Sequence, residues 1–457
     1  YLFLPLCFIC YYIVQKTSSR NVILLVFSLV FYAWGEPKYI FLMIATAFVD
    51  YVFGLLIERF RGRWQSKLFL TFAAVITLSS LALFKYSSFF SENVNSLFSL
   101  NLPSLKLALP IGISFYTFQA LTYVIDVYRG SVKVQPSFYK LLLYVSMFPQ
   151  LIAGPIVRYS DVEEQIEERT VTLKNISAGV MRFSAGLLKK AIIANFAGQL
   201  TEKLIGGDLT GLSSAGAWIG IISYTLQIYF DFSGYSDMAI GLGHMLGFRF
   251  LENFNYPFLA DSITDFWRRW HISMGTWFKD YVYIPLGGNK GGLVKQLRNI
   301  AIVWLLTGFW HGASWNFVLW GVYFGVLLVL EKLFLLKLLK KLPAALRHVY
   351  ALLLITLSWT LFAFTDISAG FAWLGSMFSG VLFDSDSVYL LLTYGPMLLL
   401  CAFAATPIGK RIYDWLNGHL KQGVLTVADC GGMLCVLTAA AAYLVSGSYN
   451  PFLYFRF

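Results

Sequence analysis

The sequence predicts an all-α, polytopic membrane protein, and three observations support this prediction. Of the 457 residues, 58% are hydrophobic and only 13% are charged, whereas soluble domains average about 25% charged residues. The mean hydropathy is high, at +0.66. Apolar runs of about 18 or more residues, long enough to span a bilayer as helices, recur along the chain. These long unbroken runs argue against a membrane β-barrel.

Short links rich in Lys and Arg separate the apolar runs. We expect membrane segments near 1–15, 21–34, 39–57, 67–88, 106–125, 137–156, 174–196, 213–243, 297–310, 313–331, 349–366, 388–406 and 427–446. The positive-inside rule places the links on the cytoplasmic side, which requires that one segment, 137–156, enters and leaves the membrane by the same face. This pattern predicts about eleven transmembrane helices with one re-entrant element.

The whole chain, 1–457, is expected to form a single integral-membrane domain, because no soluble-sized polar block interrupts it. The net charge of +11 comes from the basic residues of the cytoplasmic links. These residues would attract anionic lipid or an anionic acyl carrier, so nucleic acid is not an expected partner. The five cysteines lie in or beside apolar segments without a ligand-like spacing, so no disulfide or metal site is predicted.

Two polar features stand out in the first half of the chain. One is a stripe with helical spacing along segment 106–125 and its exit, made of Tyr116, Gln119, Tyr123 and Asp126. Such a stripe either lines a cavity or bonds neighbouring helices. The other is Gln150 in F-P-Q-L-I-A-G-P-I-V-R (148–158), where prolines interrupt the helix and favour a re-entrant loop.

The segment Y-F-D-F-S-G-Y-S-D-M-A-I-G (229–241) carries two acids within an apolar span. Asp231 and Tyr235 are i,i+4 neighbours, so the phenol can reach the carboxylate. Two interpretations stay open: Asp231 and Asp237 take part in the chemistry, or they pair with arginine or backbone amides and fix the packing.

An aromatic and basic stretch follows. Ser262 and Asp265 match the start of a capping box, and the next residues predict one amphipathic helix in the cytoplasmic membrane interface. This helix contains His271, either a structural hydrogen-bonding residue or a catalytic one. The basic residues Arg268, Arg269 and Lys290 are candidates for steering an anionic donor, although the glycine-rich turn around Lys290 lacks the context of a phosphate-binding loop.

His311 lies inside an apolar run, where an ionisable group is costly and usually functional. Burial favours neutral imidazole, which is the form that a general base needs. Asn316 and the indole N–H of Trp310 are candidates for stabilising an oxyanion. The alternative is that His311 is a satisfied core residue.

These residues carry a resemblance to a known family. W-R-R-W-H-I-S (267–273), W-F-K-D-Y-V-Y-I-P-L-G-G-N (277–289) and T-G-F-W-H-G-A-S-W-N-F-V-L-W-G (307–321) resemble the membrane-bound O-acyltransferase family. The similarity is to its bacterial polysaccharide branch, which includes membrane components of alginate and peptidoglycan O-acetylation. Similar pieces occur in the family's order along nearly the full length, at 31–34, 109–119, 149–156 and 229–241.

The resemblance implies a fold and a reaction. The family fold is a ring of membrane helices with interfacial helices around a central tunnel. His311 matches the family's essential histidine, and His271 matches its second conserved polar position. The implied reaction takes acetyl from cytoplasmic acetyl-CoA, a co-substrate and not a bound cofactor. It delivers acetyl to an extracytoplasmic polysaccharide through a secreted or anchored esterase-like partner, at the bacterial cytoplasmic membrane.

The aromatic tail P-F-L-Y-F-R-F (451–457) is expected outside, and it resembles the ending of the same branch. Tyr454 is a candidate acyl relay, with an interfacial aromatic anchor as the alternative. Other functions also stay open: D-alanyl transfer to teichoic acid from a carrier protein, or a non-catalytic transporter or scaffold.

Overall fold

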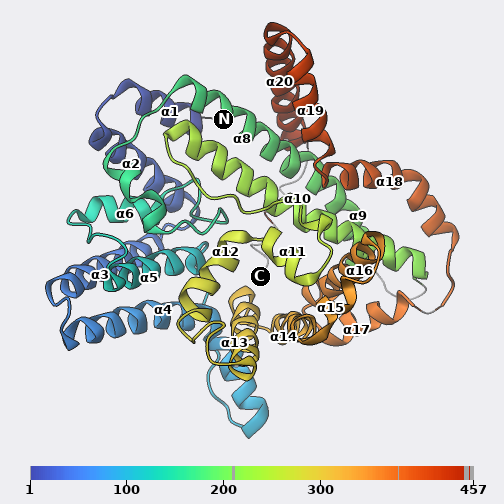
Figure 1. Ribbon diagram of the computed structural model, residues 1–457, viewed down its shortest axis with the longest axis horizontal. Helices are drawn as coiled ribbons and strands as arrows, with labels where there is room; N and C mark the ends of the chain where they lie inside the picture. Colours follow the sequence, from blue (N-terminus) through green and yellow to red (C-terminus); the bar gives the residue numbers. More distant parts are fainter. Residues whose placement is uncertain (1, 106, 208–211, 379, 447–451, 453–457) are drawn as a thin grey trace. The chain divides into compact units, whose positions relative to one another are not determined.

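The computed structural model describes every residue except 1, 106, 208–211, 379, 447–451 and 453–457. Each regular element in this described part is a helix (Figure 1), which confirms the all-α prediction. Six described helices are long and apolar enough to cross a membrane: α2, α3, α4, α16, α18 and α20. The membrane-protein prediction is therefore confirmed, while the number of about eleven spans stays a prediction.

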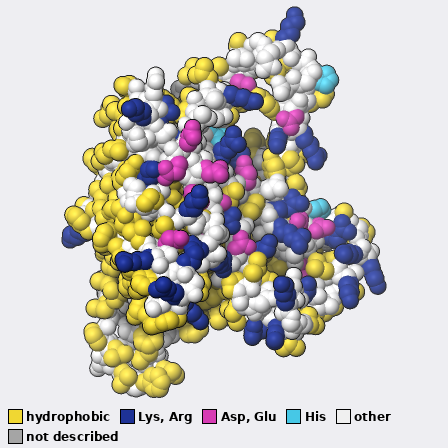
Figure 2. Space-filling model, turned by 60° about the vertical axis from the view of Figure 1, so that its left-hand side comes forward, with side chains coloured by type: hydrophobic (Ala, Val, Ile, Leu, Met, Phe, Trp, Pro, Cys, Tyr) yellow, Lys and Arg dark blue, Asp and Glu magenta, His cyan; other side chains and the backbone are white. Residues whose placement is uncertain are grey.

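The helices follow the expected apolar segments closely. Their bounds are α1 Phe3–Ile13, α2 Thr17–Gly35, α3 Ile40–Arg59, α4 Trp64–Phe98, α5 Ile113–Arg129, α6 Phe138–Ser146, α7 Tyr159–Glu167, α8 Leu173–Leu188, α9 Asn195–Ile205, α10 Ser214–Leu246, α11 Ile263–Arg269, α12 Ile272–Phe278, α13 Leu293–His311, α14 Trp315–Leu330, α15 Leu336–Leu339, α16 Ala344–Ala363, α17 Ile367–Ser376, α18 Ser385–Ala404, α19 Ile408–His419 and α20 Gln422–Ser446. Wide hydrophobic areas and separate groups of Lys and Arg appear on the face shown in Figure 2, as expected for a membrane protein.

The chain divides into two compact units, which are described separately, and the single integral-membrane domain stays a prediction. The first unit contains Tyr1–Val180 and Ala239–Leu251. Within it α3 packs against α4 and α5, and α2 packs against α6. The helix expected to break near Pro149 does end at Ser146, and turns follow it. This agrees with a helix interrupted by proline.

A buried arginine holds the first unit together around the link that follows α7. Arg169 donates to the hydroxyl of Tyr11 at 2.8 Å, to the side-chain oxygen of Asn21 at 2.6 Å and to the carbonyl of Leu246 at 3.1 Å. Its guanidinium also lies 4.4 Å from the ring centroid of Phe248. One side chain therefore joins α1, α2 and the end of α10.

The second unit contains Met181–Met238 and Glu252–Phe457, and it holds both histidines of interest. Its centre is the hairpin of α13 and α14, which packs against α16. A Cβ atom at Gly308 would lie 2.5 Å from the carbonyl oxygen of Phe317, and one at Gly321 would lie 2.4 Å from that of Trp304. Glycine at these positions lets the two helix backbones approach closely.

The prediction of a single interfacial helix around His271 is wrong. Ser262 does cap α11, since its hydroxyl accepts from the amide of Asp265 at 3.1 Å. However, α11 ends at Arg269 and α12 begins at Ile272. His271 between them has φ of +46°, a left-handed conformation that breaks the helix. The tryptophans of this stretch therefore do not form one helical face.

Candidate functional site

The two histidines converge on one indole in the second unit. The ring centroid of Trp310 lies 5.9 Å from that of His271 and 5.0 Å from that of His311. Both histidines are buried, with exposed fractions of 0% and 6%. Trp310 and His311 end α13, whereas His271 comes from the junction of α11 and α12. The structure therefore brings together the two predicted catalytic histidines.

A polar network fixes the orientation of His271. The side-chain oxygen of Asn253 accepts from the backbone N–H of Ser273 at 3.2 Å and from its hydroxyl at 2.9 Å. The amide nitrogen of Asn253 donates to the hydroxyl of Ser236 at 3.1 Å. Asn253 Oδ1 also lies 3.1 Å from Nδ1 of His271.

This network also determines where the proton of His271 resides. A backbone N–H can only donate, so the Asn253 atom that faces Ser273 must be the amide oxygen. The same oxygen faces Nδ1 of His271, so Nδ1 carries the hydrogen and Nε2 carries the lone pair. Nε2 is buried and has no hydrogen-bond partner among the residues that the structure describes.

Burial also keeps His271 neutral. This residue lies outside the six long apolar helices. Loss of solvation lowers its pKa from 6.5 to about 3, because a charged imidazolium is disfavoured in an apolar environment. The ring of Phe232 packs edge-on against the imidazole of His271, with 4.7 Å between the ring centroids. His271 is therefore a neutral, rigidly held hydrogen-bond acceptor.

An aromatic shell surrounds His311. The ring centroids of Trp320 and Phe362 lie 4.9 and 5.4 Å from its own. His311 is the last residue of α13, and the chain turns at once into α14. Gly312 permits this turn, because a Cβ atom there would lie 2.3 Å from the ring of Phe317. The carboxyl end of α13 also stabilises positive charge that develops on the imidazole.

Two further indole groups belong to the aromatic cluster of His311: the ring of Trp320 contacts His311, and the ring of Trp359 contacts that of Trp320. The Nε1 atoms of Trp320 and Trp359 are buried and have no hydrogen-bond partner among the described residues. Their rings lie 6.1 Å apart. Buried donors without partners are rare in folded proteins, and a substrate oxygen would satisfy them.

The predicted oxyanion donor Asn316 is already engaged. Its side-chain N–H donates to the carbonyl of Leu361 at 3.2 Å and so ties α14 to α16. This contact favours a positioning role for Asn316. Trp310, the other predicted donor, lies between the two histidines.

The two acids of α10 are paired with basic residues. Asp231 forms an ion pair with Lys190, and Asp237 contacts Lys189 at 2.6 Å and Arg182 at 2.8 Å. These contacts confirm pairing with basic residues as the interpretation of these carboxylates. A buried pair of this kind holds helices in register.

Phe452 lies in the same neighbourhood. Phe452 is 6% exposed, and its ring lies 5.3 Å from that of Tyr235 and 5.9 Å from that of Phe232. Since Phe232 touches His271, Phe452 is buried one ring away from the histidine. Tyr454 lies outside the described residues.

The predicted donor-binding residues are in the second unit. Arg268 is exposed, and Arg269 is held by Asp265 at 2.8 Å. Lys290 is exposed in the glycine turn before α13. This turn is ordered by hydrogen bonds, including one from Tyr283 to Asn289 at 2.7 Å.

Gln119 and Gln150 belong to the first unit, and both are buried. The side-chain N–H of Gln150 donates to the backbone carbonyl of Tyr144 at 3.1 Å, and the hydroxyl of Tyr144 donates to the backbone carbonyl of Gln119 at 3.3 Å. Tyr123 of the same stripe accepts from the amide of Gln135 at 3.0 Å. The side-chain oxygens of Gln119 and Gln150 are buried and have no hydrogen-bond partner among the described residues, so both interpretations of the stripe stay open.

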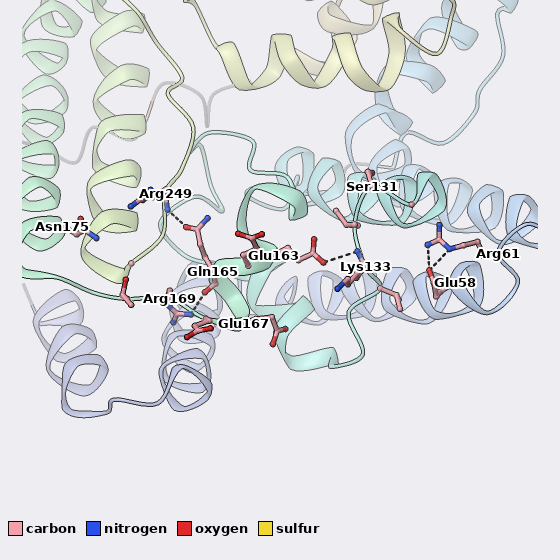
Figure 3. Close-up of a pocket in the computed structure, with 17 residues that line it drawn as sticks. Glu58, Arg61, Ser131, Lys133, Glu163, Gln165, Glu167, Arg169, Asn175 and Arg249 are labelled. Atoms are coloured by element: carbon pink, nitrogen blue, oxygen red, sulfur yellow. Dashed lines mark hydrogen bonds and ion pairs between the residues drawn. The ribbon is translucent and has the colours of Figure 1, made fainter.

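The first unit also contains a polar pocket of about 1180 Å³, shown in Figure 3. Acidic and basic side chains line it together, among them Glu58, Arg61, Glu163 and Arg249. Its groups are largely satisfied by one another, as the ion pair of Arg61 with Glu58 illustrates. It contains none of the predicted site residues.

A buried carboxylate, which sequence reasoning missed, anchors α11. Glu331 is 1% exposed and accepts from the backbone N–H groups of Ile263 and Thr264, at 2.7 and 2.8 Å. It also accepts from the hydroxyl of Tyr350 at 3.2 Å. An acid at a helix N-terminus satisfies free amides and complements the helix dipole. Glu331 thereby fixes the helix that leads to His271.

Comparison with known proteins identifies the family. The family model for membrane-bound O-acyltransferases matches residues 129–367. A probable alginate O-acetylase of Azotobacter vinelandii is 37% identical over 100% of this chain and 98% of its own length. A peptidoglycan O-acetyltransferase of Helicobacter pylori is 33% identical over 100% of this chain and 95% of its own.

A more distant relative is the teichoic acid D-alanyltransferase of Bacillus subtilis, 30% identical over 49% of this chain and 59% of its own. The family match and the full-length relatives together identify the family. The chain belongs to the membrane-bound O-acyltransferase family and is an O-acyltransferase.

Proposed function

We propose that this protein takes acetyl from cytoplasmic acetyl-CoA and delivers it across the bacterial cytoplasmic membrane for O-acetylation of an extracytoplasmic polysaccharide. The observation that carries the proposal is the convergence of His271 and His311 on Trp310 in a buried aromatic site. The full-length similarity to O-acetylating relatives supports acetyl as the group transferred. The D-alanyltransferase matches only half of this chain, so D-alanyl transfer is the weaker alternative.

In the proposed mechanism His311 is the general base. The acceptor hydroxyl attacks the thioester carbonyl while His311 takes its proton. The indole N–H of Trp320, with that of Trp359 next to it, stabilises the oxyanion that develops on the carbonyl. The carbon–sulfur bond then breaks, and the CoA sulfur leaves as a thiol with the proton from His311. Exclusion of water by the surrounding rings strengthens each of these interactions.

His271 orients a reacting group and does not move the proton. Its protonated Nδ1 is held by Asn253, so Nε2 can accept a hydrogen bond from one of the two substrates. Arg268, Arg269 and Lys290 attract the CoA phosphates to the cytoplasmic face. The burial of Phe452 near His271 supports the tail, with Tyr454, as the acyl relay to an esterase-like partner.

Labelled acetyl-CoA tests this proposal with protein reconstituted in liposomes. The expected result is release of CoA thiol, with the label on added polysaccharide, on a partner protein or on Tyr454. A preference for a D-alanyl carrier protein, with no thiol released from acetyl-CoA, would refute acetyl transfer. Vesicles in which acetyl-CoA moves without thiol release would indicate a transporter.

A further inference from the structure

A large apolar groove lies in the second unit, and neither His271 nor His311 lines it. It has a volume of about 1000 Å³ and is walled by α10, α16 and α18. Aliphatic side chains make up most of its lining, for example Ile222, Leu352 and Leu399. Along α18 it extends from Leu391 to just beyond the helix at Thr406, which is about 22 Å at the rise of a helix.

The groove lies where lipid is the solvent. Two of its walls, α16 and α18, are among the helices able to span a membrane. Pro396 in α18 has no N–H to donate to the preceding turn, which weakens that helix beside the groove. A Cβ atom at Gly395, which lines the groove, would meet nothing within 4 Å. A space of this size between membrane helices suits acyl chains and disfavours water.

One end of the groove is polar and flanked by basic residues. His348, near the start of α16, and Thr406, after the end of α18, line it. The chain on either side carries Lys410 and Arg411, and also Arg347, which pairs with Asp261 at 3.1 Å. Both basic links are expected on the cytoplasmic side. The groove therefore combines an apolar body at membrane depth with a positive cytoplasmic end.

We propose that this groove binds an anionic phospholipid of the cytoplasmic leaflet, with an acyl chain along α18 and the phosphate near His348 and Thr406. Cytoplasmic basic clusters attract anionic headgroups, and the apolar lining accepts the chain. The same end touches the segment before α11: Phe258 and Leu259 line the groove, and His348 Nδ1 lies 3.0 Å from the carbonyl oxygen of Ala260. A bound lipid would thus support the segment that leads to His271.

Native mass spectrometry of the purified full-length protein tests the proposal. It compares phosphatidylglycerol, phosphatidylcholine with the same chains, and glycerol phosphate without chains. The expected result is a one-to-one adduct with phosphatidylglycerol that is about tenfold tighter than that with phosphatidylcholine, and no adduct with glycerol phosphate. Equal affinity for the two lipids would overturn the headgroup assignment. Binding of glycerol phosphate alone would overturn the role of the chain.

Variants locate the lipid. Gly395→Leu and Ala402→Trp fill the groove from two positions, and each is expected to abolish the adduct. Leu400→Trp is the matched control, because Leu400 is exposed on the same helix and lies outside the groove lining. Lys410→Gln with Arg411→Gln is expected to weaken phosphatidylglycerol binding roughly tenfold and to leave phosphatidylcholine unchanged. If Gly395→Leu and Leu400→Trp, both monodisperse, retained the adduct equally, the groove would not be the site.

Discussion

His271 and His311 lie against the same indole, but the rest of their surroundings differ. Hydrogen bonds hold His271: Asn253 fixes its tautomer, and its backbone adopts a left-handed conformation. Aromatic rings and a helix end surround His311. A histidine held by an amide presents one defined lone pair and suits orientation. A histidine at the carboxyl end of a helix, where positive charge is stabilised, suits proton transfer.

Replacement of His311 should have the largest effect of any change to the pair. His311→Ala removes the proposed base, so the rate of thiol release should fall by about 10²–10⁴-fold, with the protein still inserted and monodisperse. His311→Gln, which keeps a polar group of similar size, should be equally inactive. Thiol release from labelled acetyl-CoA measures both, and an active glutamine variant would contradict proton transfer.

The Trp320 indole should have the next largest effect. Trp320→Phe keeps an aromatic ring beside His311 but removes the N–H, so kcat should fall by about 10²-fold with KM little changed. Trp304→Phe is the matched control within the same aromatic cluster, because its ring contacts that of Trp320 and not the histidines in the contacts described. Similar kinetics for the two variants would count against an oxyanion role.

Loss of the Asn253 amide should change activity less and alter its pH dependence. Asn253→Ala removes the group that fixes His271, and the rate should fall by roughly 10-fold to 100-fold, as for other groups that orient a site residue. Asn253→Asp keeps the acceptor but adds a charge that raises the pKa of His271, so the acid limb of the pH–rate profile should move to higher pH. An unchanged profile in both variants would show that Asn253 does not act through His271.

His271 should also make stability depend on pH. Its folded pKa of about 3 is below the ordinary value of 6.5, so below pH 6.5 the unfolded chain takes up a proton that the folded protein refuses. Stability is therefore complete above pH 6.5 and falls as pH drops toward 3, by about 2 kcal/mol at pH 5. Thermal unfolding of the wild type and of His271→Asn between pH 5 and 7 measures this difference. Identical slopes would contradict a neutral buried His271.

The smallest expected effect is at Glu331, which acts through α11. Glu331→Gln keeps one acceptor oxygen but loses the charge at the helix N-terminus, so stability should fall by about 1–3 kcal/mol. Activity per folded molecule should change less than in Asn253→Ala. Thermal unfolding measures the loss of stability, and thiol release per folded molecule measures the change in activity. A Glu331→Gln protein as stable as the wild type would show that this cap is dispensable.

The same contrast explains what the sequence could predict. The apolar segments, the cap at Ser262 and the turn after His311 follow from local patterns, and the structure agrees with them. The family motifs located both histidines. Local patterns could not predict that both histidines contact Trp310, because His271 and Trp310 lie in two separate segments of the chain.

What could not be predicted depends on contacts between distant residues. Asn253 lies 18 residues before His271, with α11 between them, and Glu331 reaches α11 from the end of α14, so neither spacing signals the contact. The helix break at His271 was missed because its aromatic periodicity continues through the break, and only the backbone angle reveals it. For the acids of α10 the sequence left catalysis and pairing open, because their partners Lys189 and Lys190 lie about 40 to 50 residues earlier in the chain.

The most direct test of the difference between the two histidines is chemical rescue. Thiol release is measured for His311→Ala and His271→Ala in liposomes, with and without added imidazole. If His311 is the base and His271 orients, imidazole should restore part of the rate in His311→Ala and none in His271→Ala. Full activity of His311→Ala without imidazole, or rescue of His271→Ala alone, would contradict the assignment.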